Sequence, residues 1–128
     1  MAVTLSNVAN PLGTLLVTDI ETNSIAEENV TGGAGTIFSI QIDNTLNTTG
    51  VYIKIADNAM AGTTSADQTP NWVYYAPAGK TVTYACPGGS PFGTALSFWG
   101  TIVKASSVGQ ALTQSDPTNL VTVKILTS

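Results

Sequence analysis

The chain has 128 residues, with four lysines, no arginine, no histidine, one cysteine and a formal net charge of −4. This length is typical of one domain, and a hydrophobic content of 43% is enough to fill a core, which argues against a disordered chain. Nucleic-acid binding in its ordinary form is excluded, because it relies on Lys and Arg to neutralise phosphates. The same shortage of basic residues disfavours binding to an anionic membrane surface.

Export and membrane signals are not expected either. No run of apolar residues approaches the roughly 18 that a membrane-spanning helix needs. The first residues, Met-Ala-Val-Thr, contain neither the basic region nor the apolar segment of a signal peptide. The single cysteine, Cys86, excludes an intramolecular disulfide framework.

Strand-forming residues recur at short intervals along the chain, separated by glycine, proline and asparagine. Alternation of apolar and polar residues is strictest from Phe38 to Ile42, and it recurs from Val51 to Ile55. Such alternation indicates strands with one face in a core and the other toward water or a partner. Eight strands are expected, in chain order, at residues 3–8, 14–22, 36–43, 51–56, 71–76, 80–85, 95–105 and 120–126.

Turn residues divide these strands. Residues 32–35 predict a turn that opens a strand, residues 44–50 a hairpin connection, and residues 77–79 a tight turn. The glycines and prolines of residues 86–91 predict an interruption of the sheet ladder. The long polar loop at residues 57–70 indicates a functional segment or one ordered by a neighbour.

About eight short strands in 128 residues predict an all-β fold, a single antiparallel β-sandwich of jelly-roll or immunoglobulin-like type. The Cys…Trp…Cys spacing of an immunoglobulin domain proper is missing. Without a repeat or a linker, residues 1–128 form one domain, with residues 1–11 a candidate N-terminal arm. The order of the strands does not follow from the sequence.

The residue inventory argues against an enzyme. Without histidine, neither a Ser-His-Asp triad nor an ordinary zinc site can form. Asp19 and Glu21 are two apart, hence on one face of a strand, where a carboxylate pair would be a solvated outer face more readily than a glycosidase site. The Asp43-Asn44 and Asp57-Asn58 pairs suit calcium, but capping of turns explains them without a metal. We expect no catalytic residue, cofactor or metal.

Aromatic residues offer a second class of function. Trp72, Tyr74 and Tyr75 fall on one predicted strand, and Trp99 on another, so rings are expected on both faces of each. Exposed aromatic rings stack on sugars and also anchor protein interfaces. A carbohydrate-binding or adhesin module that uses these four residues, on a phage tail or fibre, is therefore the alternative function.

The region from Phe38 to Ser97 resembles small bacteriophage virion proteins. A strand ending in Ile-Asp-Asn at residue 44 is followed by Val-Tyr-Ile-Lys-Ile-Ala-Asp at residues 51–57 and by a polar loop. A strand then leads into Pro-Ala-Gly at residues 77–79, and Gly-Ser-Pro-Phe-Gly-Thr-Ala-Leu-Ser follows at residues 89–97. The resemblance implies a capsid-surface or tail-associated β-sandwich and no active site.

We therefore expect a bacteriophage virion structural protein, a capsid decoration (cement) protein that binds the outer capsid surface and stabilises the shell. Its partners would be capsid protein and copies of itself as a homo-oligomer, in the virion after assembly in the host cytoplasm. Residues 1–11 would act as an arm that reaches a neighbour. The expected partner contacts are Val3, Leu5, Val8, Trp72, Tyr74, Tyr75, Phe92 and Trp99.

Overall fold

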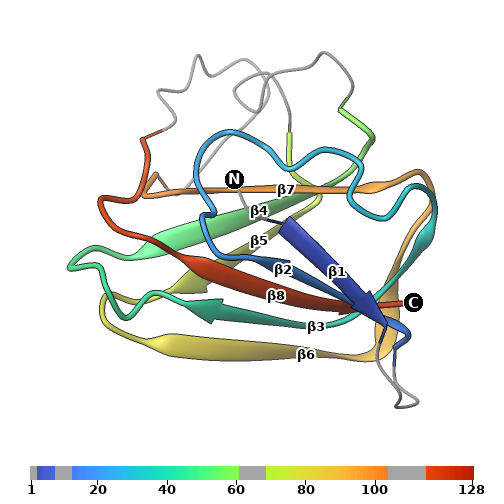
Figure 1. The fold of residues 1–128 in the computed structure, drawn as a ribbon, viewed down its shortest axis with the longest axis horizontal. Helices are drawn as coiled ribbons and strands as arrows, with labels where there is room; N and C mark the ends of the chain where they lie inside the picture. The colour runs from blue at the N-terminus through green and yellow to red at the C-terminus, as the bar shows by residue number, and fades with distance from the viewer. Residues whose placement is uncertain (1–2, 8–12, 61–68, 104–114) are drawn as a thin grey trace.

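The computed structural model describes residues 3–7, 13–60, 69–103 and 115–128. These residues form two antiparallel sheets, of five strands in the order β1-β2-β8-β3-β6 and of three in the order β5-β4-β7. The sheets lie face to face (Figure 1), which confirms the predicted all-β sandwich. The strands are β1 (Val3–Asn7), β2 (Leu15–Asp19), β3 (Gly35–Asp43), β4 (Val51–Asp57), β5 (Trp72–Ala76), β6 (Thr81–Phe92), β7 (Leu96–Thr101) and β8 (Thr122–Thr127).

A ninth segment extends the smaller sheet. Glu27 and Phe98 exchange backbone hydrogen bonds of 2.8 and 3.1 Å, so the chain around Glu27 lies along the free edge of β7. With this segment counted, the smaller sheet has four members, and the β2-β8-β3-β6 part of the larger sheet faces it. The strand pairs are nested along the chain, which means that each pair encloses the next one in sequence. From the outermost to the innermost, they are β2 with β8, the Glu27 segment with β7, β3 with β6, and β4 with β5. This nesting is that of a jelly roll and not of an immunoglobulin domain.

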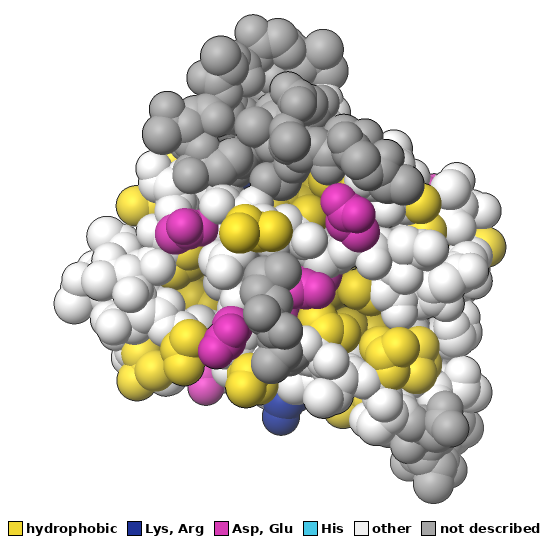
Figure 2. Space-filling model, turned by 45° about the horizontal axis from the view of Figure 1, so that its top comes forward, with side chains coloured by type: hydrophobic (Ala, Val, Ile, Leu, Met, Phe, Trp, Pro, Cys, Tyr) yellow, Lys and Arg dark blue, Asp and Glu magenta, His cyan; other side chains and the backbone are white. Residues whose placement is uncertain are grey.

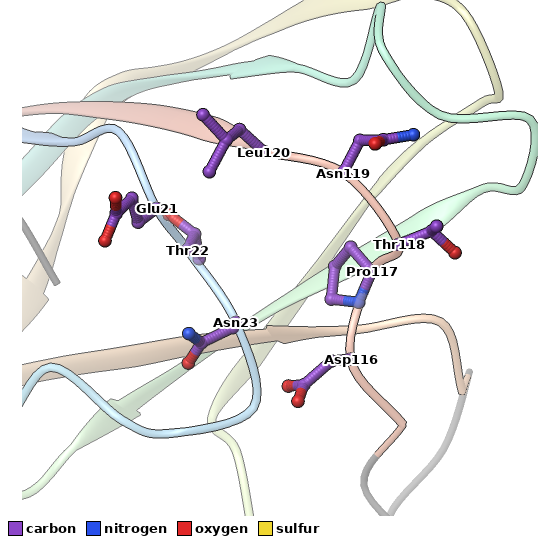
Figure 3. Close-up of a pocket in the computed structure, with 8 residues that line it drawn as sticks. All are labelled: Glu21, Thr22, Asn23, Asp116, Pro117, Thr118, Asn119 and Leu120. Carbon is purple, nitrogen blue, oxygen red and sulfur yellow. The ribbon is translucent and has the colours of Figure 1, made fainter.

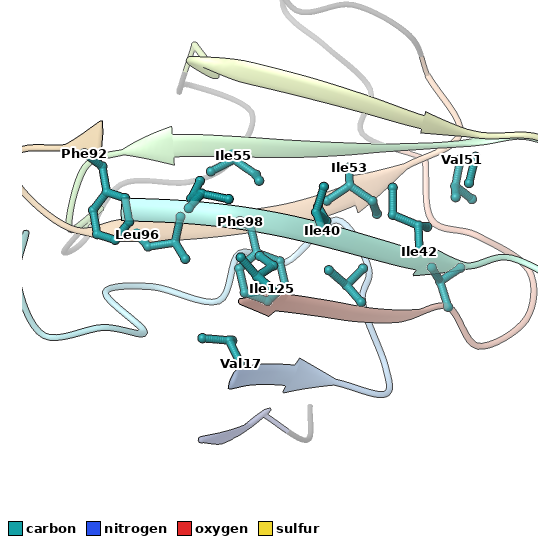
Figure 4. Close-up of a cluster of buried hydrophobic side chains, with 14 residues drawn as sticks. Val17, Ile40, Ile42, Val51, Ile53, Ile55, Phe92, Leu96, Phe98 and Ile125 are labelled. Atoms are coloured by element: carbon teal, nitrogen blue, oxygen red, sulfur yellow. The ribbon is translucent and has the colours of Figure 1, made fainter. Parts of the chain in front are cut away.

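The core fills the space between the two sheets. Ile40 and Ile42 of β3 face Ile53 and Ile55 of β4 across it, as the alternating pattern predicts (Figure 4). All four side chains are fully buried, and burial of each stabilises the fold by about 1.5–3 kcal/mol. The other buried members of the cluster are Val17, Ile37, Val51, Ala76, Phe92, Leu96, Phe98, Val121, Val123 and Ile125.

The predicted interruption of the ladder at residues 86–91 is confirmed for residues 86–89, which pair with no residue of β3, but the strand itself does not end there. β6 continues to Phe92, and its pairing with β3 moves from Ser39 opposite Ala85 to Ile37 opposite Ser90. Residues 86–89 therefore form a bulge, with φ angles of 79° at Gly88 and 81° at Gly89. A Cβ at Gly89 would lie 2.3 Å from Cγ2 of Thr36, so glycine allows the two strands to approach each other and to resume pairing.

The predicted hairpin at residues 44–50 is wrong, because β3 and β4 belong to different sheets. The segment crosses between the sheets, and buried Asn44 holds the crossing. Its Nδ2 donates to the backbone oxygens of Thr49, Ala76 and Pro77 at 2.9, 3.2 and 3.2 Å. The tight turn at residues 77–80 is confirmed by the 3.2 Å bond from Lys80 N to Pro77 O.

Strand ends differ by a few residues from those expected. β2 ends at Asp19 instead of residue 22, and β7 ends at Thr101, with residues 104 and 105 outside the described part. Residues 3–7 of the expected arm form β1, which pairs with β2 of the same chain. Among the described residues, no helix is long and apolar enough to span a membrane.

Candidate functional site

The crossing from β2 to the edge of β7 builds the most distinctive surface of the molecule. After β2, Thr22 N donates to Val121 O at 3.0 Å, which keeps the chain beside the approach to β8. Gly100 N then donates to Asn23 O at 2.8 Å, which attaches the chain to β7 of the other sheet. Residues 20–25 thus bridge the two sheets and lie against residues 115–121.

A groove of about 360 Å³ lies where these two segments run side by side. Figure 3 shows Glu21, Thr22 and Asn23 on one wall and residues 116–120 on the other, with the Asp116 carboxylate directed toward the first wall. Asp116 Oδ1 accepts a 2.8 Å hydrogen bond from Ser24 N, which ties the walls together. The lining residues are Glu21, Thr22, Asn23, Asp116, Pro117, Thr118, Asn119 and Leu120.

Aliphatic side chains on the segments that form this groove are exposed to water. Ile20, Ile25 and Leu120 are 47%, 67% and 54% exposed, and they belong to the two walls or their direct continuations. Ile102, 37% exposed, joins them through the 3.0 Å bond from its N to Ser115 O. These four are half of the eight large hydrophobic side chains that are exposed among the described residues. We call them the groove rim.

Acidic side chains lie on the same segments as the groove rim. Glu21 and Asp116 line the groove, and exposed Glu28 follows on the same crossing. Neither residues 19–31 nor residues 115–121 contain a lysine. Figure 2 shows one face of the molecule, on which acidic and hydrophobic side chains are interspersed and a basic side chain lies at the lower edge. A partner at this surface would combine apolar groups with positive charge.

Two further carboxylates lie beneath this surface, between the sheets. Asp19 is fully buried at the end of β2, where its Oδ1 accepts a 2.9 Å bond from Glu21 N. Its Oδ2 and the Oε1 of Glu27 are both buried, and neither has a hydrogen-bond partner among the residues that the structure describes. Burial, and then the charge of Asp19, raise the pKa of Glu27. The expected solvated pair of Asp19 and Glu21 is therefore wrong, because β2 ends at Asp19 and only Glu21 is exposed.

The two expected Asp-Asn pairs cap turns, as predicted for the case without a metal. Asp43 Oδ1 accepts from Thr45 Oγ1 and N at 2.6 and 3.0 Å, and these bonds lower its pKa. Asp57 accepts from Gly93 N and Thr94 N at 2.8 Å each, and these bonds lower its pKa in the same way. Among the described residues, no group of three or more His, Cys, Asp or Glu side chains could hold a metal.

Most aromatic residues predicted as contacts lie inside the sandwich. Trp72 and Tyr74 are half-buried and pack against the core, and burial together with the contact to Cys86 raises the pKa of Tyr74 to about 12. Phe92 and Trp99 are buried. Of the four residues expected to form a sugar-stacking platform, only Tyr75 is exposed, beside Tyr52 with ring centroids 4.8 Å apart.

Of the two predicted contacts on β1, one side chain is half-buried and the other is exposed. Val3 is half-buried against the core, whereas Leu5 is exposed, because β1 extends the larger sheet beyond its partner sheet. Val8 lies outside the described residues. Leu5 and Tyr75 are therefore the two predicted contacts with an exposed side chain among the described residues.

Trp99 and Lys54 form a buried pair that sequence reasoning did not find. They lie opposite each other on β7 and β4, on the face of the smaller sheet that points away from the core. Both are fully buried, and within the described part of the chain neither Lys54 Nζ nor Trp99 Nε1 has a hydrogen-bond partner. Burial lowers the pKa of Lys54. Ala56 and Met60 pack against Trp99 there and form a second, smaller hydrophobic cluster.

The groove rim was also missed by sequence reasoning, although a signal exists. Residues 20–25 read Ile-Glu-Thr-Asn-Ser-Ile, so two isoleucines flank four polar residues where β2 ends. Comparisons with family models, curated proteins and solved structures find no match. The function proposed below is therefore argued from the geometry and from the sequence resemblance.

Proposed function

We propose that the protein is a structural component of a bacteriophage virion, a decoration protein that binds the outer capsid surface and stabilises the shell. The observation that carries this proposal is the groove rim, in which Leu120 lines the groove, Ile20 and Ile25 are exposed on the crossing that forms one wall, and Ile102 is exposed beside Ser115. Exposed aliphatic side chains gathered in one place and surrounded by polar groups mark a protein-binding surface. The partner that fits is capsid protein, and copies of this chain would lie beside it.

The energetics of the groove rim favour a protein partner over a small polar ligand. Complete burial of an isoleucine or leucine contributes about 1.5–3 kcal/mol, and several such side chains close together form the centre of a stable interface. The carboxylates of Glu21, Glu28 and Asp116 would then form a polar border that selects a partner with positive charge.

The outward face of the larger sheet supports contact with a lattice. Its central row, read across the five strands, carries mostly short, uncharged side chains, in the order Thr4, Thr18, Lys124, Gln41 and Thr83. Lys124 is the one charged side chain of this row, so burial of the row against a neighbouring protein would desolvate a single charge. The jelly-roll arrangement occurs in viral capsid domains, although a fold does not by itself assign a function.

Binding to virions of the phage that encodes the chain tests the proposal. Ile25→Asp with Leu120→Asp places two charges in the groove rim, and we expect at least a tenfold loss of copies per virion, since about 1.4 kcal/mol corresponds to tenfold in affinity. Copies are counted by quantitative gel analysis of purified particles. The thermal stability of the shells should fall with the copy number.

Val73→Asp provides the matched control, because Val73 is 47% exposed on the outer face of β5, away from the groove. Each variant is first shown to unfold at a temperature close to that of the unchanged protein. Equal incorporation of all variants would remove the groove rim from the interface. Absence of the unchanged protein from virions would overturn the proposed function itself.

A further inference from the structure

β1 forms one edge of the larger sheet. Among the described residues it pairs only with β2, so the backbone N–H and C=O groups on its other side have no partner strand there. A strand edge of this kind can pair with a strand of another chain, and proteins usually block it with charged side chains, proline or a bulge. β1 reads Val-Thr-Leu-Ser-Asn, pairs with β2 without a shift of register, and precedes the first charged residue of the chain, Asp19. It therefore lacks the features that protect an edge from strand addition.

The opposite edge of the same sheet carries these protective features. β6 contains Pro87 and Pro91, and residues 86–89 form the bulge described above. The hydroxyl of Tyr84 on β6 also donates to the backbone oxygen of Tyr75 on β5, the edge strand of the smaller sheet. The β6 edge is thus protected by its own sequence, whereas the β1 edge is not. The contrast between the two edges indicates that β1 is the one that another chain extends.

Leu5, at the centre of β1, is the apolar side chain that such an extension would cover. It pairs with Val17 of β2 and therefore lies on the same face of the sheet, which is the inward face. Leu5 is nevertheless 51% exposed, whereas Val17 is fully buried, because β1 extends the larger sheet beyond the smaller one. A strand added beside β1 would place a side chain directly opposite Leu5, with the two Cβ atoms about 4.5–5.5 Å apart.

We propose that two copies of the chain pair through β1, antiparallel and about a two-fold axis at Leu5. In this register Leu5 lies opposite Leu5 of the second copy and Thr4 lies opposite Ser6, so apolar meets apolar and hydroxyl meets hydroxyl. The same residues serve on both copies, as a two-fold dimer requires. A strand from an unrelated protein would be selected by charge or by side-chain pockets, and uncharged β1 offers no charge for such selection. The two larger sheets would join into one continuous sheet.

This dimer goes beyond the proposed function and does not use the groove rim. A pair of five-residue strands buries less area than a standard stable interface, so we expect a weak dimer with a Kd of roughly 10⁻⁵ M. Copies held close together on a shell would pair more readily than free copies, because their effective concentration is higher. A monomeric chain that still binds virions would overturn the dimer and leave the proposed function standing.

Analytical ultracentrifugation of the full chain, from about tenfold below to about tenfold above that Kd, should show a monomer that becomes a dimer. Leu5→Lys places two like charges opposite each other at the axis, and we expect dimerisation at least tenfold weaker. Leu46→Lys is the matched control, because Leu46 is 62% exposed outside β1 and the change in charge is the same. A monomer at every concentration, or equal dimerisation of Leu5→Lys and the unchanged protein, would overturn the proposal.

An introduced disulfide tests the register of the two strands. In a chain that carries Cys86→Ala, Leu5→Cys places two thiols directly opposite each other, within the Cα separation of about 4.4–6.8 Å that a disulfide needs. Ser6→Cys in the same background is the control, since its two copies would be displaced by about 7 Å along the strands as well as across them, too far for a disulfide. Mild oxidation should link Leu5→Cys into dimers on non-reducing gels. Equal linkage of Ser6→Cys would overturn the register, and linkage of neither would overturn the pairing.

Discussion

Two crossings between the sheets bury polar side chains in opposite ways. At residues 44–50, Asn44 and Asn47 are buried and make a closed network, in which Asn47 Nδ2 donates to Asn44 Oδ1 at 2.9 Å. Asn47 Oδ1 accepts from Asn119 N at 2.7 Å, which ties the crossing to the approach to β8. At residues 19–27, by contrast, Asp19 Oδ2 and Glu27 Oε1 are buried and have no hydrogen-bond partner among the described residues.

The difference follows from the hydrogen-bonding capacity of the two kinds of side chain. The amide of asparagine both donates and accepts, so a small set of asparagines can satisfy one another and the backbone without any ligand. An ionised carboxylate only accepts, so two of them cannot satisfy each other. A buried polar group that is fully paired specifies the structure, whereas an unpaired one marks a place where something else can bind. Three substitutions test this contrast.

The largest effect is expected from Asn44→Ala. It removes the donor to three backbone oxygens, one of them in a buried hydrogen bond and two in partly buried ones. We expect a loss of about 3 kcal/mol in the free energy of unfolding, measured by urea denaturation. Thr48→Ala, an exposed change in the same crossing, should stay within about 0.5 kcal/mol of the unchanged protein. Similar losses for both variants would mean that the network has no special role.

A medium effect is expected from Asp57→Asn, which tests a carboxylate that is paired. The Asp57 oxygens accept from three successive backbone amides at residues 93–95, and these bonds lower its pKa below the ordinary 3.8. The carboxylate therefore stabilises the fold above that pH, and the contribution is lost as the pH falls. Because Asp57 is partly exposed to solvent, we expect a loss of only about 1 kcal/mol at neutral pH.

The measurement for Asp57→Asn is urea denaturation at pH 7 and again near pH 3. The difference between the variant and the unchanged protein should shrink at the lower pH. A difference that is constant with pH would show that the charge of Asp57 does not contribute.

The smallest effect, with the opposite sign, is expected from Glu27→Gln. The pKa of Glu27 is raised above its ordinary 4.5 in the folded state, so its stabilising contribution is complete below that value and is lost as the pH rises through the folded-state pKa. At neutral pH the variant should therefore be the more stable protein, by up to about 1 kcal/mol after allowance for solvent around this half-buried side chain. The gain should vanish near pH 4. A variant less stable than the unchanged protein at pH 7 would show that burial of the Glu27 carboxylate does not cost stability.

Sequence reasoning found the strands but not the site. The alternation of Phe38–Ile42 and Val51–Ile55 predicted which residues fill the core, because period two is a local property of a strand. It could not reveal that Asp19 would be buried and Glu21 exposed, since this depends on β2 ending at Asp19 and on the chain crossing to β7. Trp99 was predicted to be exposed enough for contact and is buried, because position on a strand does not tell which face is covered.

The sequence by itself determined the all-β class, the positions of the eight strands and the isoleucines that fill the core. Each of these follows from preferences within a few consecutive residues. Only the tertiary structure decided the jelly-roll order, the meeting of residues 20–25 with residues 115–121 in one groove, and the approach of Asp19 to Glu27. These features join segments up to about a hundred residues apart, and such pairings depend on crossings between sheets that no local pattern encodes.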